Sequence, residues 1–194
     1  MSPPLQLRLV TSAPSLAALP PTPAEVAVAG RSNVGKSSLI NALANRRDLA
    51  HTSKTPGRTQ LLNCFEHAGG GTVVDLPGYG YAAVPGRVKA TWGRMISTYL
   101  LEREGLVAVM VLVDGEIGPT KLDVETLAWL RFHDLPLAVV ATKQDKVASQ
   151  KRLRRRDELA AGCGVAAADV AWVSATKGNG IEQLRGQVRG WLSA

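Results

Sequence analysis

The sequence predicts one α/β domain of three layers, in which a mainly parallel sheet of about six strands lies between helices. Continuous apolar runs such as LVAVMVLVD (106–114) and LAVVATK (137–143) are typical of strands buried on both faces. Helical patterns such as TKLDVETLAWLRF (120–132) alternate with these strands along the chain. The 194 residues, of which 45% are hydrophobic, are enough for one such core.

The remaining elements continue this alternation. Six prolines in the first 23 residues predict an extended N-terminal arm over 1–23, followed by the domain over 24–194. Further strands are expected at EVAVA (25–29), QLLNCFEH (60–67), TVVDL (72–76) and VAWVS (170–174), and further helices at 37–45, 86–104, 149–160 and 180–192.

Composition narrows the class of protein. The net charge of +7 favours polyanionic partners, although many basic proteins bind no nucleic acid. Cys64 and Cys163 match no metal-binding spacing, so buried free thiols in a reducing compartment are expected. The chain shows no signal-peptide pattern and no apolar run of about 18 residues. A cytoplasmic protein without a membrane partner is therefore predicted.

A phosphate-binding loop is predicted at GRSNVGKS (30–37), which fits G-x-x-x-x-G-K-[ST] between a strand and a helix. Gly30 and Gly35 allow the backbone to turn so that successive N–H groups face phosphates. Lys36 could reach the β- and γ-phosphates, and the Ser37 hydroxyl could bind Mg²⁺. The pattern predicts nucleotide binding but does not name the base.

Guanine is indicated by TKQD (142–145), which follows a strand at the edge where open α/β sheets bind ligands. Asp145 could accept two hydrogen bonds from guanine, whereas adenine offers no donor at those positions. The Lys143 stem could lie along the base, and backbone amides of SAT (174–176) could meet the guanine oxygen.

Two further segments complete a nucleotide switch. In DLPGYGY (75–81), Asp75 is a candidate acidic residue near Mg²⁺, and the Gly78 amide would contact the γ-phosphate. Tyr79 stands where many GTPases have a glutamine that orients water. The loop 51–61 is rich in turn residues and offers four hydroxyls, at Thr52, Ser53, Thr55 and Thr59, between which spacing does not choose.

Together, GRSNVGKSS, KTPGRTQLLN, DLPGYGYA, TKQD and VSA resemble the EngB family of bacterial Era-like GTPases. The resemblance extends from about Val10 to the last helix and includes GPTKLD (118–123). It implies a phosphate-loop GTPase domain that hydrolyses GTP to GDP. A slow intrinsic rate is expected, because GTPases without their activators can be slow. It also implies a role in assembly of the large ribosomal subunit, with that subunit or its precursor as the partner and no DNA. Normal septation in cell division would depend on this role.

The resemblance also assigns site residues. It implies Ser37 and Thr59 as Mg²⁺ ligands, and we take Lys36, Asn33 and Thr59 as the candidate catalytic residues. The nucleotide contacts that it implies are Gly30, Arg31, Ser32, Asn33, Val34, Gly35, Lys36 and Ser37; Gly57, Arg58, Thr59, Gln60 and Leu61; Asp75, Leu76, Pro77 and Gly78; Thr142, Lys143, Gln144 and Asp145; and Val173, Ser174 and Ala175.

The sequence leaves three questions about the mechanism open. Because Tyr79 cannot replace glutamine chemically, a nucleotide-gated ribosome-binding scaffold with negligible hydrolysis is one alternative. A phosphate-loop kinase is another, although no inserted lid is visible in the sequence. Asn33 either helps to hold a K⁺ ion beside the phosphates, as in related Era-like proteins, or only tolerates a tight turn.

A candidate ribosomal RNA surface is KRLRRR (151–156), which has five cations in six residues; a solvated helix face is the alternative. Arg87, Lys89 and Arg94 could join it. We expect Arg154, Arg155 and Arg156 changed to Glu to weaken binding to ribosomal particles but not to GTP. Where the family often has a small residue, Arg and His, this chain has 115–117 as GEI, which removes a possible RNA-contacting cation.

Overall fold

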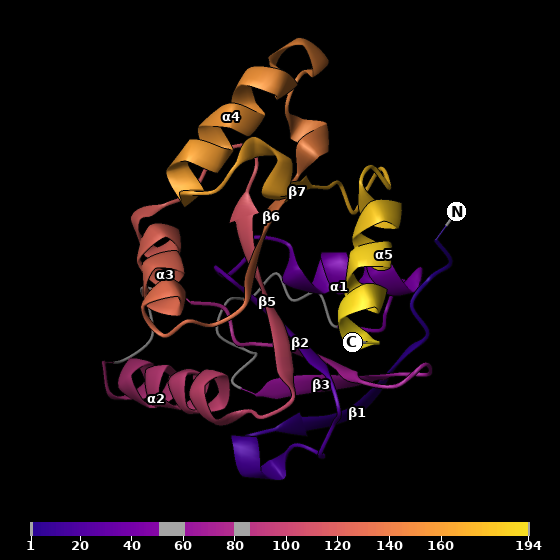
Figure 1. The fold of residues 1–194 in the computed structure, drawn as a ribbon, viewed down its shortest axis with the longest axis vertical. Coiled ribbons are helices and arrows are strands. Elements are labelled where there is room, and N and C mark those ends of the chain that lie inside the picture. The colour runs from indigo at the N-terminus through magenta and orange to yellow at the C-terminus, as the bar shows by residue number, and fades with distance from the viewer. Residues whose placement is uncertain (1, 51–60, 80–85, 194) are drawn as a thin grey trace.

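The structure, a computed structural model, describes residues 2–50, 61–79 and 86–193, without the side chains of 86–92 (Figure 1). Its strands are β1 (Leu7–Ala13), β2 (Glu25–Gly30), β3 (Leu62–His67), β4 (Thr72–Asp75), β5 (Leu106–Asp114), β6 (Leu137–Thr142) and β7 (Val170–Trp172). Its α-helices are α1 (Lys36–Ala44), α2 (Gly86–Glu102), α3 (Lys121–Phe132), α4 (Arg152–Cys163) and α5 (Ile181–Leu192). Short 3₁₀ turns include Gln144–Lys146 and Ser149–Lys151.

The seven strands form one sheet in the order β1-β3-β4-β2-β5-β6-β7. From β4 across to β7 every pairing is parallel, whereas β3 is antiparallel to both β1 and β4. The prediction of a mainly parallel sheet is confirmed, with one strand more than the sequence indicated. Because the strands from β4 to β7 are parallel, their carboxyl ends meet at one edge, where ligands bind in open α/β sheets.

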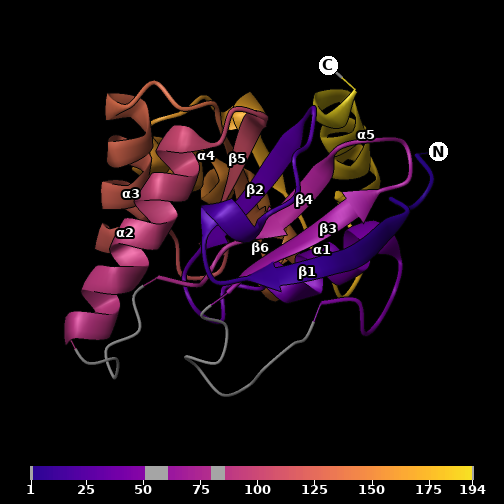
Figure 2. The same cartoon turned by 90° about the horizontal axis from the view of Figure 1, so that it is seen from below.

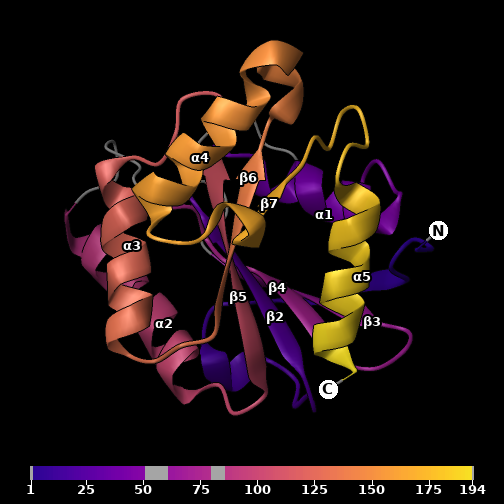
Figure 3. The same ribbon diagram turned by 45° about the horizontal axis from the view of Figure 1, so that its top comes forward.

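Helices cover both faces of the sheet, so the domain has three layers (Figure 3). One core cluster joins α1 and α5 to residues such as Val26, Val28 and Met110 on one face of the strands. The other joins α2, α3 and α4 to the alternate residues, such as Ala27 and Val109. This alternation within continuous apolar strands is what burial on both faces requires.

Within residues 2–23, one segment belongs to the sheet and a short 3₁₀ turn, Leu16–Ala18, follows it. Residues 7–13 form β1, which pairs with β3 and lies at the sheet edge (Figure 2). The residues before β1 contact the helices α1 and α5. The Leu5 N–H donates to the carbonyl of Leu43 in α1, and the Arg189 side chain in α5 donates to the Ser2 hydroxyl and the Pro3 carbonyl. The stretch 2–13 thus packs on the domain at both β3 and α5.

The two cysteines are buried and unpaired, as the sequence predicts. Burial raises the pKa of the Cys64 thiol to about 12 and that of Cys163 to about 11, so both stay protonated near neutral pH. Among the described residues, no helix combines the length and the hydropathy that crossing a membrane would require.

Candidate nucleotide-binding site

The phosphate loop lies between β2 and α1, as expected. Gly30 has a φ of 157°, and a Cβ there would come within 2.9 Å of Val34, so only glycine fits. Gly35 has a φ of 111° and precedes the first residue of α1, Lys36. Asn33 is exposed and has a φ of 64°, in the left-handed region that Asn tolerates, which supports the tight-turn explanation of this residue.

Strand β6 is hydrogen-bonded directly to this loop. The Thr142 hydroxyl donates to the carbonyl of Val34 at 2.8 Å, and both residues are buried. TKQD and the phosphate loop, which are more than 100 residues apart in the chain, are therefore held side by side at the carboxyl edge of the sheet. This is the arrangement that one nucleotide bound by its base and its phosphates requires.

Lys36 and Asp75 form the charged centre of the site. Burial lowers the pKa of the Lys36 amine, although the charge of Asp75 opposes this shift. Burial also raises the pKa of Asp75 to about 6, against the opposing effects of Lys36 and of a hydrogen bond with Asn63. The Oδ1 atom of Asp75 is buried and has no hydrogen-bond partner among the described residues.

The candidate guanine-binding residues are held by interactions that the sequence did not reveal. Asp145 accepts a hydrogen bond of 2.6 Å from the buried Ser174 hydroxyl, which lowers the pKa of this carboxyl. Lys143 pairs with Asp114, the last residue of β5, at 2.6 Å. Asp114 closes an apolar strand as Asp75 does, and this shared position is the signal that could have identified it.

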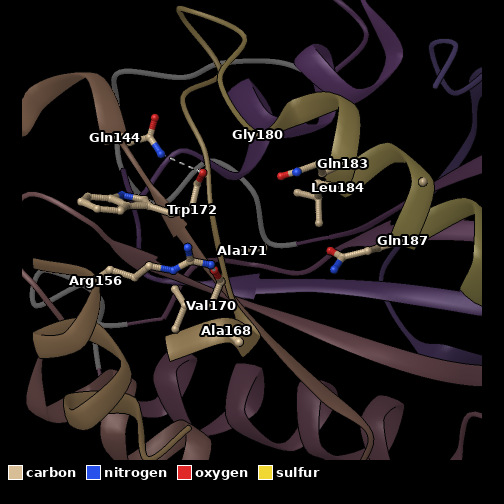
Figure 4. A pocket seen from close by; sticks show the side chains of 11 residues that line it. Gln144, Arg156, Ala168, Val170, Ala171, Trp172, Gly180, Gln183, Leu184 and Gln187 are labelled. Atoms are coloured by element: carbon tan, nitrogen blue, oxygen red, sulfur yellow. Dashed lines mark hydrogen bonds between the residues drawn. The ribbon is translucent and has the colours of Figure 1, made fainter. Parts of the chain in front are cut away.

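Gln144 supports the end of β7 rather than facing the phosphate loop. Its Nε2 donates to the carbonyl of Trp172 at 3.2 Å, as Figure 4 shows. It lines a cavity of about 780 Å³ on the outer side of β7, between α4 and α5, and no residue of 30–37 lines that cavity. Arg156 lies in the same cavity and donates to the carbonyl of Val170, so both outward-facing carbonyls of β7 are capped by side chains.

The predicted residues divide into those that the structure brings together and those outside the described residues. Gly57, Arg58, Thr59 and Gln60 are outside them, as are Thr52, Ser53 and Thr55. Leu61 precedes β3 and is 37% exposed. The residues gathered at the carboxyl edge are 30–37 after β2, 75–78 after β4, 142–145 after β6 and 173–175 after β7.

The comparisons with known proteins agree with this geometry. A family model described as 50S ribosome-binding GTPase matches residues 25–143. The probable GTP-binding protein EngB of Geobacter metallireducens is 46% identical over 175 residues, which is 90% of this chain and 86% of that protein. EngB of an Enterobacter species is 45% identical over 97% of this chain and 92% of that protein.

Solved structures show the same fold. A crystal structure of a probable GTP-binding protein EngB has a TM-score of 0.73 and 26% identity, and the alignment covers 88% of this chain and 99% of that one. Era in complex with part of 16S ribosomal RNA has a TM-score of 0.64 and 20% identity, covering 89% of this chain and 58% of that one. At that identity the likeness to Era shows the fold alone. The full-length match to the curated relatives goes further, and this chain belongs to the EngB family of GTP-binding proteins, which are GTPases.

Proposed function

We propose that this protein is a GTP-dependent switch in the assembly of the large ribosomal subunit, and that cell division depends on it through that role. The observation that carries the proposal is the match of residues 25–143 to a family of 50S ribosome-binding GTPases. Era, which has this fold, was crystallised with ribosomal RNA, so the fold is compatible with such a partner. Work on ribosomal particles would place the protein in the cytoplasm.

Several groups among the described residues support the proposal that GTP binds at this site. Lys36 and the N-terminus of α1 would hold the phosphates, and Asp145 would select guanine. The preorganised loop and the buried amine would stabilise charge that develops on the γ-phosphate. The match to a GTPase family favours GTP hydrolysis over the kinase and scaffold alternatives.

A magnesium site fits the same residues. The buried Asp75 Oδ1 has no hydrogen-bond partner among the described residues, and the half-buried Ser37 lies in the first turn of α1. Such oxygen atoms suit Mg²⁺. When bound, Mg²⁺ would neutralise part of the charge of the phosphates. The resemblance adds Thr59 as a ligand and potassium at Asn33, and both stay proposals.

Tyr79 does not act as the missing glutamine in the conformation described. Its hydroxyl donates to Asp123 at 2.9 Å, so the side chain is directed toward α3. The group that orients water must come from elsewhere, such as switch backbone groups or the ribosomal partner. A slow intrinsic rate that rises with ribosomal particles is the expected consequence.

The surface for ribosomal RNA is smaller than the cation run in 151–156 indicates. Arg155 donates to the carbonyls of Gly115 and Glu116, and Arg156 donates to those of Ala167 and Val170. These two arginines hold loops in place, so replacing them would disturb the fold. The triple change to Glu is therefore a poor test of RNA binding.

Arg154 and Lys151 remain as candidate phosphate-binding residues on α4 and the turn before it. Lys151 is exposed. The Arg154 side chain is 87% exposed and, within the described part of the chain, pairs only with Glu158 one turn away. Such exposed pairs contribute little to stability, so these two residues can be changed without unfolding the protein.

The test is co-sedimentation with 50S particles in GTP, in GDP and without nucleotide, with GTP turnover measured alongside. We expect binding to depend on the nucleotide. We expect Lys151→Glu with Arg154→Glu to weaken binding, and to reduce the slope of its salt dependence by roughly 0.7–0.9 for each RNA phosphate that the variant no longer neutralises. Lys121→Glu is the matched control for Arg154→Glu alone, because Lys121 is 90% exposed and has the same kind of pairing, with Glu125, but on α3. Particle binding that is the same in all three nucleotide conditions would refute the switch.

A further inference from the structure

Asp123, at the start of α3, is a buried carboxylate that joins three parts of the site. Its side chain has no exposed surface. Its Oδ2 accepts hydrogen bonds from the backbone N–H and the hydroxyl of Thr120, at 2.7 and 2.8 Å, which caps the helix. Its Oδ1 accepts the Tyr79 hydroxyl at 2.9 Å. The Nε of Arg31, in the phosphate loop, lies 3.2 Å from Oδ2 as an ion pair without hydrogen-bond alignment.

The backbone of the same segment is also fastened to the phosphate loop. The Ser32 N–H donates to the carbonyl of Tyr79 at 3.1 Å, and residues 31 and 79 form a parallel bridge. The Ser32 hydroxyl lies 3.5 Å from the carbonyl of Gly78, at the limit of a hydrogen bond. Tyr79 is therefore held at both its backbone and its side chain, against two different elements.

These contacts place Gly78 close to Ser32 and Lys36, two residues of the phosphate loop. A Cβ on Gly78 would lie 2.9 Å from the N and Oγ atoms of Ser32 and 3.0 Å from the Lys36 amine, so not even a methyl group fits. The Lys36 amine is the group that reaches the γ-phosphate in loops of this type. If the γ-phosphate lies between the Lys36 amine and the Gly78 amide, as the sequence predicts, Gly78 and Tyr79 must move outward to admit it. GDP has no γ-phosphate and imposes no such requirement.

We propose that Tyr79, Asp123 and Arg31 form a latch that holds Gly78 against Lys36, and that this latch sets the preference of the protein for GDP over GTP. The inference rests on the nucleotide switch proposed above. It gives Tyr79 a positioning role in place of the catalytic role of glutamine. Movement of Gly78 away from Ser32 breaks the Tyr79–Asp123 hydrogen bond, while Thr120 still caps α3 through the other carboxylate oxygen.

The test compares the dissociation constants of GDP and of a non-hydrolysable GTP analogue for the parent and for Tyr79→Phe, which removes only the hydroxyl. Loss of a hydrogen bond to a buried carboxylate should tighten binding of the GTP analogue about tenfold and leave GDP affinity within about twofold. Asp123→Asn is the second variant and should change the ratio in the same direction.

Tyr99→Phe is the matched control, because the Tyr99 hydroxyl also donates to a buried carboxylate, Glu25, at 2.6 Å. It should lower thermal stability without changing the ratio of the two affinities. An unchanged ratio in Tyr79→Phe, or an equal loss for both nucleotides, overturns the latch and leaves the proposed switch standing. Failure of the parent to bind either nucleotide would instead overturn the proposed function.

Discussion

Glu25 on β2 and Asp75 on β4 are both buried carboxylates, and they lie at opposite ends of the pairing between these two strands. Glu25 accepts hydrogen bonds from Tyr99 and Thr72 at 2.6 Å and two from Arg103 at 2.9 Å. Asp75 keeps its Oδ1 without a partner among the described residues.

The difference indicates that Glu25 stabilises the fold, whereas Asp75 belongs to the candidate binding site. Four donors compensate Glu25 for the loss of water, and they tie the start of β2 to β4 and to the end of α2. At the carboxyl edge, by contrast, burial alone raises the pKa of Asp75 against the attraction of Lys36. A buried carboxylate that lacks part of its hydrogen bonding destabilises the folded chain until a ligand compensates it.

The largest expected effect on stability is at Glu25, the buried carboxylate that has four hydrogen-bond donors. Glu25→Gln leaves the guanidinium of Arg103 without its charge partner in a nearly buried position, and should lower the free energy of unfolding by about 3–5 kcal/mol in urea titrations. The matched control is Glu66→Gln, which removes the exposed pair with Arg8 and should cost less than about 1 kcal/mol. Equal losses in the two variants would show that the buried network contributes no more than a surface pair.

The opposite sign is expected for Asp75→Asn. The pKa of Asp75 rises from 3.8 to about 6 on folding, so the free energy of unfolding of the parent falls as the pH rises through this interval. Above it, the full shift corresponds to about 3 kcal/mol, which Asp75→Asn should recover. GTP turnover should nevertheless fall, since the variant replaces a carboxylate oxygen of the proposed magnesium site.

Urea titrations at several pH values check the cause of this gain. The carboxyl is neutral in both states only well below its unfolded pKa of 3.8, so Asp75→Asn should give no gain below about pH 3 and its full gain above about pH 7. A gain of the same size at both pH values would mean that packing, rather than the buried charge, is responsible.

The sequence predicts contiguous features of this molecule better than interactions between distant segments. The phosphate loop and TKQD are recognisable because each carries its chemistry within a few residues and follows an apolar strand. The hydrogen bond between Tyr79 and Asp123 joins residues 44 apart, and nothing local to either indicates it. β1 is not predicted for a similar reason. Its pairing partner β3 lies about 50 to 60 residues further along the chain, and the prolines around β1 dominate the local pattern.

The smallest expected effect on stability concerns Asn33 in the phosphate loop. Its φ of 64° lies in the left-handed region, which costs conformational free energy. Asn33→Gly should keep the stability of the parent, because glycine adopts this conformation freely. Asn33→Ala should lose about 1 kcal/mol in the same urea titrations, since a Cβ is disfavoured there.

The same pair of variants separates the backbone role of Asn33 from an ion-binding role. If the left-handed turn alone accounts for this residue, Asn33→Gly turns over GTP like the parent in both potassium and sodium buffers. A loss of turnover in Asn33→Gly that is confined to potassium would instead assign the amide side chain to a K⁺ ion beside the phosphates. Because glycine preserves the backbone and removes only the amide, neither outcome can be attributed to a distorted phosphate loop.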